Sequence, residues 1–176
     1  GSGVSIDALT IQGPPTGIAI HGSQTSLTNL RIIDTLVGVD VIESDDVVIE
    51  SSELTDGREM GIRATGCDQL LVHEVEITGL HGEDGGWKCG CECVGYFPAV
   101  DGTSVTGIQV EDSSNVLIDH VLFADLRGGT GSPEMDYNAQ ADPGDGGDTF
   151  GISVTGSSNV TVESTTMTDI NPGDRG

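Results

Sequence analysis

Three of the chain's four cysteines lie in one short run, Cys89, Cys91 and Cys93, and His81 precedes this run by eight residues. Three thiolates and one imidazole could bind zinc or another soft metal ion. Alternate cysteines are, however, not a standard zinc-finger spacing. In an oxidising compartment, four cysteines more often form two disulfides, and Cys67 is then a partner of this run. Metal ligands, disulfides, and free or intermolecular thiols are all kept as interpretations.

A second candidate site is an acidic, glycine-rich stretch in which Asp142, Asp145 and Asp148 are three residues apart. Their carboxylates could offer oxygen ligands to calcium. An EF-hand loop spaces its first ligands by two residues, so an acidic loop without an ion is the competing interpretation. The candidate cofactors are therefore calcium and a soft transition metal.

Aromatic and basic side chains are scarce in this chain, which has one tryptophan and one lysine. Aromatic residues and arginine are enriched at binding interfaces. The tryptophan, the lysine, both tyrosines and one arginine lie within two long irregular stretches, residues 79–106 and 124–150. We predict that a ligand or partner binds Trp87, Lys88, Tyr96, Arg127 and Tyr137.

The elements that must position these side chains follow from a recurring pattern. Apolar residues alternate with polar ones, which predicts half-buried β-strands. In each copy an apolar anchor lies five residues before a second buried position, and successive anchors up to Val72 are 21, 22 and 23 residues apart. Such a period indicates a repeat architecture. The anchors are Ile6, Leu27, Ile49, Val72, Ile118 and Val162, and their partners are Ile11, Ile32, Leu54, Ile77, Phe123 and Met167.

A second phrase, Gly-Ile-x-Val, locates two insertions. From the buried partner to this glycine the chain takes 6 or 7 residues in the first three copies, but 30 and 28 residues in the last two. The last two copies are therefore ordinary repeats with insertions, residues 79–106 and 124–150, at the same place. If each repeat is one turn of a parallel β-solenoid, the insertions lie side by side. Long excursions on a rigid scaffold often carry function.

The Gly-Ile-x-Val phrases and the Asn-Val-x-Ile/Val phrases at Asn115 and Asn159 resemble those of right-handed parallel β-helix repeat proteins, including pectate-lyase-like and copper-accessory-like members. The resemblance covers nearly the whole chain. It implies an all-β, single-stranded, right-handed parallel β-helix of about six coils with two long loop insertions. It implies no single function, because that family includes polysaccharide lyases and hydrolases, epimerases, tailspikes, surface proteins and copper-site accessory proteins. The last group makes copper an alternative to zinc at the cysteines.

A carbohydrate-active enzyme is one alternative that the resemblance raises. Polygalacturonase-like members carry Asn-Thr-Asp, an Asp-Asp pair, Gly-His-Gly and Arg-Ile-Lys. This chain has Asp45-Asp46 and His81-Gly82, but it lacks the basic motif, and the order and spacing differ. A polysaccharide lyase needs a base in its cleft, and only Lys88 and Arg127 are placed for that role. We therefore assign no catalytic residue and favour a non-catalytic function.

Stacked repeats also predict two columns of equivalent residues. A turn column contains small side chains, so Cys67 fits it as a serine-like residue: Ser23, Ser44, Cys67, Ser113 and Ser157. An outward column follows the anchors: Asp7, Thr28, Glu50, His73, Asp119 and Glu163. We interpret the outward column as a solvated face, and an acidic groove with a proton-transferring histidine is the alternative.

The charge of the chain is extreme, with 29 Asp and Glu against 6 Lys and Arg and a net charge of -23. Such a surface repels nucleic-acid phosphates and anionic membranes, so we discount nucleic acid as a partner and exclude membrane insertion. High salt would screen the self-repulsion, which predicts a halophilic archaeal source. No stretch resembles a transmembrane span or a signal peptide.

These observations predict a single domain, residues 1–176, with both insertions stacked on one side. We expect an extracellular or cell-surface scaffold whose insertions form the interaction site. No capping helix is visible at either end, so we expect end-to-end self-association or a larger parent protein. Polysaccharide is a further candidate partner. The alternatives are the carbohydrate-active enzyme and a copper- or zinc-binding protein that uses the cysteines.

Overall fold

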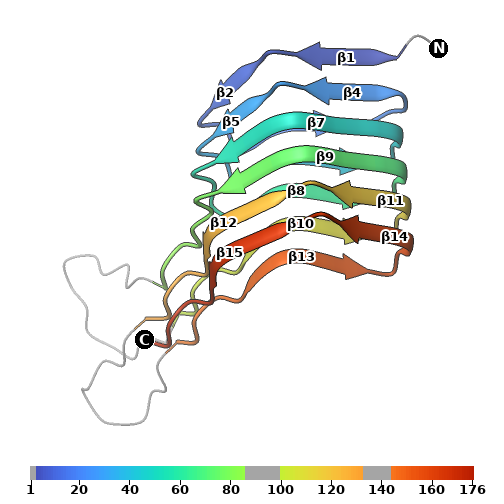
Figure 1. Cartoon of the computed structure of the whole chain (residues 1–176). Helices are drawn as coiled ribbons and strands as arrows, with labels where there is room; N and C mark the ends of the chain where they lie inside the picture. Colours follow the sequence, from blue (N-terminus) through green and yellow to red (C-terminus); the bar gives the residue numbers. More distant parts are fainter. Residues whose placement is uncertain (1–2, 86–99, 133–143) are drawn as a thin grey trace, which may run out of the picture.

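The computed structural model describes residues 3–85, 100–132 and 144–176, and these residues form fifteen β-strands and no helix. The strands wind into a solenoid in which each turn stacks on the one before it (Figure 1). Every pair of neighbouring strands is parallel. Within the described residues, no helix has the length and apolar character that crossing a membrane requires.

Two sheets form the walls of the solenoid. The first sheet is a ladder of β1 (Val4–Asp7), β4 (Thr25–Thr28), β7 (Asp45–Thr55), β9 (Asp68–Thr78), β11 (Ser114–Asp119) and β14 (Ser158–Glu163). Past a bend it continues as β2 (Thr10–Gln12), β5 (Arg31–Ile33), the ends of β7 and β9, β12 (Leu122–Arg127) and β15 (Thr166–Asn171). The second sheet contains β3 (Thr16–Ile20), β6 (Val37–Ile42), β8 (Met60–Thr65), β10 (Val105–Glu111) and β13 (Thr149–Thr155).

The strand register confirms both predicted columns of buried residues. Each anchor is the partner of the next one, from Ile6 through Val72 to Val162. The second column runs in the same way from Ile11 to Met167. The steps of 46 and 44 residues between the last anchors are therefore single turns of the solenoid.

The side chains of these columns fill the interior of the solenoid. Ile49, Val72, Ile118 and Phe123 have no exposed surface. Burying one such side chain contributes about 1.5–3 kcal/mol to stability. The repeated inward position thus builds one continuous core along the axis.

The glycine of each Gly-Ile-x-Val phrase is required by packing against this core. A Cβ on Gly61 would lie 2.6 Å from the carbonyl oxygen of Gly107 and 2.8 Å from Cγ2 of Ile77. Contacts this short force a shift of the backbone or of the buried side chain. Glycine therefore lets the second sheet begin close to the interior residues of the first.

Residues with a left-handed backbone make the corners. In one turn these are Glu43, Asp46, Ser51 and Asp56, whose φ angles lie between 46° and 56°. The left-handed region is small for side-chain-bearing residues and is most accessible to glycine, asparagine and aspartate. The fourth corner recurs one turn later at Gly79 (φ 65°), where the first insertion leaves the solenoid.

The described strands set the limits of both insertions. The first lies between the end of β9 at Thr78 and the start of β10 at Val105. Residues 124–127, which we expected to begin the second insertion, form the end of β12. The strand continues because Leu126 is a further buried position, paired with Ile170.

Candidate functional site

The chain departs from the solenoid at one corner after each of β9, β12 and β15 (Figure 1). Five short segments meet there, and backbone hydrogen bonds join them. We call them the glycine bundle: residues 82–85, 100–104, 128–132, 144–148 and 172–176. The first four segments are the two ends of each insertion.

Backbone hydrogen bonds in the glycine bundle connect one insertion to the other. The N–H of Gly85 donates to the carbonyl of Thr130 over 2.6 Å, and the N–H of Ser132 donates to that of Val100 over 2.9 Å. Within the second insertion, Gly144 donates to the carbonyl of Ser132 over 3.0 Å. Ser132 is fully buried, and its Oγ accepts the N–H of Val100 over 2.8 Å. The bases of the two insertions are therefore one hydrogen-bonded unit.

The hydrogen bonds of the bundle recur every three residues. Gly82 and Gly85 donate to the carbonyls of Arg127 and Thr130. None of the five segments is a β-strand. A three-residue repeat with glycine at the contacts is typical of polyproline II helices that pack side by side.

Only glycine fits at many positions of the bundle. A Cβ on Gly129 would overlap the carbonyl oxygen of Glu83 and lie 3.0 Å from the nitrogen of Thr103. The segments therefore pack backbone against backbone, without intervening side chains. Comparable overlaps would arise at Gly82, Gly102, Gly131, Gly147 and Gly173.

Of the five predicted partner-binding residues, Arg127 is in the described part of the chain. It ends β12 with an exposed side chain, and its N–H donates to the carbonyl of Leu80 over 2.9 Å. Arg127 therefore lies at the base of the glycine bundle. Trp87, Lys88, Tyr96 and Tyr137 lie outside the described residues.

Of the predicted soft-metal ligands, Cys89, Cys91 and Cys93 lie outside the described residues. His81 lies at the base of the bundle, where its Nε2 is 3.3 Å from Oδ2 of Asp125 and both side chains are exposed. The metal and disulfide interpretations of this stretch stay predictions.

Cys67 occupies the predicted turn column as a free thiol that is 3% exposed. Its N–H donates to Oγ of Ser113 over 3.0 Å, and its Sγ lies 3.5 Å from the carbonyl oxygens of Val41 and Thr65. Burial raises the pKa of the thiol. Cys67 thus fills the place that serine fills at Ser113.

Of the three predicted calcium ligands, Asp145 and Asp148 are in the described part of the chain and Asp142 lies outside it. Oδ1 of Asp145 lies 3.4 Å from Nε of Arg175. The N–H of Asp148 donates to Oγ of Ser104 over 3.0 Å. In the segments that the structure describes, neither aspartate belongs to a group of three close ligating side chains, and calcium binding stays a prediction.

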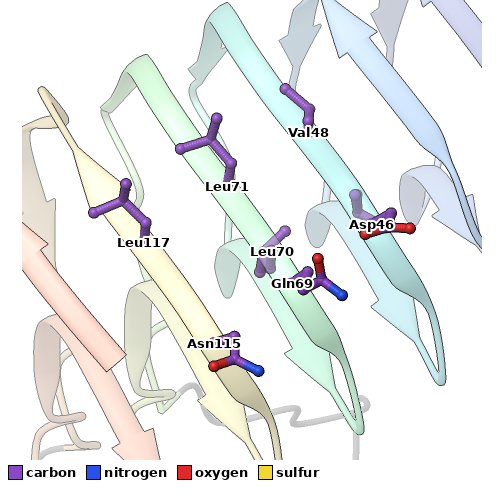
Figure 2. Close-up of a pocket in the computed structure, with 8 residues that line it drawn as sticks. Asp46, Val48, Gln69, Leu70, Leu71, Asn115 and Leu117 are labelled. Carbon is purple, nitrogen blue, oxygen red and sulfur yellow. The ribbon is translucent and has the colours of Figure 1, made fainter. Parts of the chain in front are cut away.

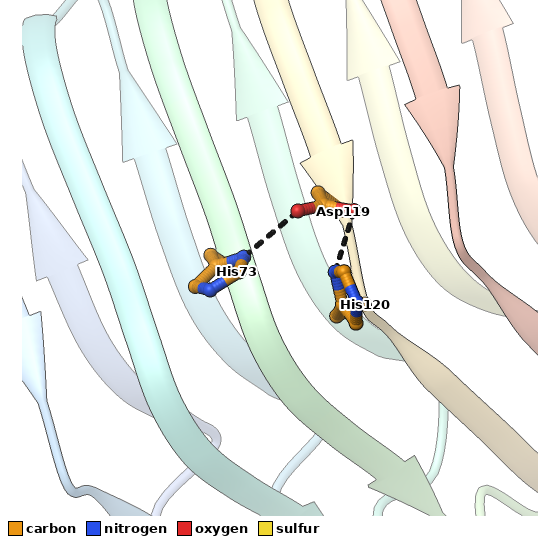
Figure 3. Close-up of side chains that lie close together, drawn as sticks. All are labelled: His73, Asp119 and His120. Atoms are coloured by element: carbon orange, nitrogen blue, oxygen red, sulfur yellow. Dashed lines mark hydrogen bonds and ion pairs between the residues drawn. The ribbon is translucent and has the colours of Figure 1, made fainter.

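A second constellation lies away from the insertions, on the outer face of the first sheet. His73 on β9 pairs in register with Asp119 on β11, and His120 follows at the corner (Figure 3). Nδ1 of His73 lies 3.1 Å from Oδ2 of Asp119, and Nδ1 of His120 lies 2.7 Å from Oδ1 of the same carboxylate. The hydrogen bond with His120 lowers the pKa of Asp119. The same bond, with the charge of Asp119, raises the pKa of His120.

The outer face also carries a shallow apolar hollow of about 300 Å³ (Figure 2). Val48, Leu71 and Leu117 line it from three successive turns. Asp46 is the one carboxylate among its lining residues. This hollow therefore offers a surface for contact rather than a pair of acid–base groups.

The last described turn, formed by β13, β14 and β15, leaves apolar side chains of the interior columns half exposed. Val162 is 45% exposed and Met167 is 47% exposed. One turn earlier, Ile118 and Phe123 occupy the same columns without any exposed surface. We call the uncovered side of β13, β14 and β15 the open face.

Comparison with known proteins agrees with this architecture. The family model described as a right-handed β-helix region matches residues 1–174. The comparisons with curated proteins and with solved structures gave no match. The match and the parallel sheets together confirm the predicted fold class. The chain therefore belongs to the right-handed β-helix family.

Proposed function

We propose that the chain is a non-catalytic scaffold of the cell surface or the extracellular space, and that its two insertions form one interaction site. The observation that carries this proposal is the glycine bundle, which ties the bases of both insertions together. Two loops that only connected strands would need no such joint base.

The energetics of the bundle support this interpretation. Ordering each backbone residue costs about 1–2 kcal/mol of conformational entropy. Glycine costs the most, and it buries no side chain in return. The backbone hydrogen bonds between closely packed segments must therefore offset the entropy cost of ordering these glycines. The first three turns of the solenoid fold without such a bundle, so its selective value lies in the placement of the insertions.

We further propose that copies of the chain associate end to end through the open face. The occupant of this face is the first turn of a second copy, because both carry the same columns. Ile6 belongs to the column of Val162, and Ile11 belongs to that of Met167. Stacking at about 4.8 Å would continue each column across the contact. The segment that follows β15 is part of the glycine bundle, so the insertions leave the solenoid beside this face.

Charge sets the condition for this association. The outward column would place Glu163 of one copy next to Asp7 of the following copy, and like charges at this distance repel. The Debye length falls from about 10 Å at 0.1 M salt to about 3 Å at 1 M salt. We therefore expect association to increase with salt concentration.

Sedimentation velocity at about 0.1 M and 1 M sodium chloride tests both parts of the proposal. The wild type is expected to form larger species at the higher concentration. Val162→Glu places a charge on the open face and is expected to keep the chain monomeric. Thr161→Glu is the matched control, because it adds the same charge on the outward side of the same strand, and it should associate like the wild type at about 1 M salt, where outward charges are screened.

The role of the insertions is tested by replacing residues 86–99 with a short Gly-Ser linker. The backbones of Gly85 and Val100 are neighbours, so a short linker can close the gap. The variant is expected to keep its thermal unfolding transition and to lose association. If the variant associates as the wild type does, the first insertion takes no part in the contact between copies. A wild type that stays monomeric at both salt concentrations would reject end-to-end assembly.

A further inference from the structure

The outer column is acidic along most of its length, yet two imidazoles meet one carboxylate in its middle. His73 is held opposite Asp119 by the parallel register of β9 and β11. His120 has a left-handed backbone with a φ of 52°, which interrupts the alternation of inward and outward side chains. Consecutive residues Asp119 and His120 therefore both face outward, between the buried residues Ile118 and Val121.

We propose that His73, Asp119 and His120 bind a divalent transition metal ion such as zinc. The ligand atoms of the three side chains lie within 4.8 Å of one another. In a tetrahedral zinc site, bonds of about 2.0–2.2 Å place neighbouring ligand atoms about 3.3–3.6 Å apart. Nδ1 of His73 lies 3.1 Å from Oδ2 of Asp119, so this pair needs only a small displacement to admit an ion. Nδ1 of His120 lies 2.7 Å from Oδ1 of Asp119, so His120 must move further.

To share one ion, the two imidazoles must also approach each other, because their ring centroids are 5.5 Å apart at an interplanar angle of 73°. The side chain of His120 is 60% exposed and can rotate toward His73. His73 is 27% exposed and Asp119 is 17% exposed, so the strands hold these two ligands. Two nitrogens and one oxygen suit zinc, nickel or copper, and solvent would complete the coordination.

Neighbouring carboxylates favour a cation at this place. Oε1 of Glu74 lies 3.7 Å from Nε2 of His73, on the side of the ring away from Asp119. A metal-bound histidine usually donates its other N–H to such a carboxylate, which fixes the ring orientation. Glu50 and Glu74 form a second group of close ligating side chains with His73, and both add negative charge beside the site. An ion here would join β9 to β11 on either side of the first insertion in the sequence.

Isothermal titration with zinc chloride tests the proposal in the full chain with Cys89, Cys91 and Cys93 replaced by serine, so that thiolates cannot contribute. One zinc ion per chain is expected to bind. His120→Gln and Asp119→Asn are each expected to weaken binding by at least about tenfold. His81→Gln is the matched control, because His81 also lies beside a carboxylate but has no second imidazole partner in the described residues. It should leave the affinity unchanged.

A second measurement needs no substitution at the site. In nuclear magnetic resonance spectra of the unsubstituted chain, zinc is expected to shift the imidazole signals of His73 and His120 and to leave that of His21 in place. Unshifted signals of both site histidines would overturn the proposal. So would a zinc affinity that His120→Gln leaves unchanged.

Discussion

Replacing Phe123 by alanine is expected to lower the free energy of unfolding by about 3–5 kcal/mol. Phe123 has no exposed surface, and among the residues that the structure describes it is the largest fully buried side chain. It stands in the second column between Ile77 and Met167, so its loss opens a cavity between two turns. Denaturant unfolding of both proteins at one salt concentration measures the difference.

Phe150→Ala is the matched control for this prediction. Phe150 lies on β13 and is 46% exposed, so the same truncation removes little buried surface. Its expected cost is below about 1 kcal/mol. Similar costs for the two substitutions would contradict the continuous interior core. A cost at Phe150 that grows with protein concentration would instead support a contact at the open face.

Gly129→Ala is expected to disrupt the glycine bundle while leaving the strands intact. The added Cβ overlaps the carbonyl oxygen of Glu83, and backbone on both sides prevents an easy escape. Overpacking of this kind costs about 1–3 kcal/mol. Because the strain is local, the clearest expected effect is faster proteolysis within the two insertions. Limited proteolysis under native conditions measures that rate.

Asp148→Ala controls for a general effect of substitution in the bundle. The side chain of Asp148 is exposed, and its described hydrogen bond to Ser104 uses the backbone N–H, which alanine keeps. Its proteolysis rate should match that of the wild type. Equal rates for Gly129→Ala and the wild type would show that the segments do not pack backbone against backbone.

The solenoid could be predicted from the sequence because each turn repeats the same inward positions. Ile6, Val72 and Val162 fall into one column once alternation and spacing are read together. The repeat could be followed across both insertions, because a Gly-Ile-x-Val phrase marks the start of the next strand after each insertion. Inward burial is local in sequence and periodic, which makes it a strong signal.

The glycine bundle could not be predicted in the same way. Its repeat of three residues is divided among five short segments that are far apart in the sequence. The sequence does contain one indication of the bundle, namely glycines that are three residues apart, as at Gly82 and Gly85 or at Gly144 and Gly147. That signal gains meaning only once the solenoid brings the segments together.

For the two histidines, the sequence predicted the position of His73 but not that of His120. Alternation placed His73 beside Asp119 correctly, because both are outward positions on neighbouring strands. Alternation would turn His120 toward the interior, but its left-handed backbone turns it outward. Strand periodicity fails at such corners, since each corner residue resets the side that its neighbours face.

The most direct test of the account is amide hydrogen exchange in the glycine bundle, read by mass spectrometry. The N–H groups of Gly85, Ser132 and Gly144 donate to backbone carbonyls across the bundle. They are expected to exchange slowly, at rates comparable to those of β9, because opening requires both insertions to separate. Exchange at the rates of an unstructured peptide would contradict a joint base for the two insertions.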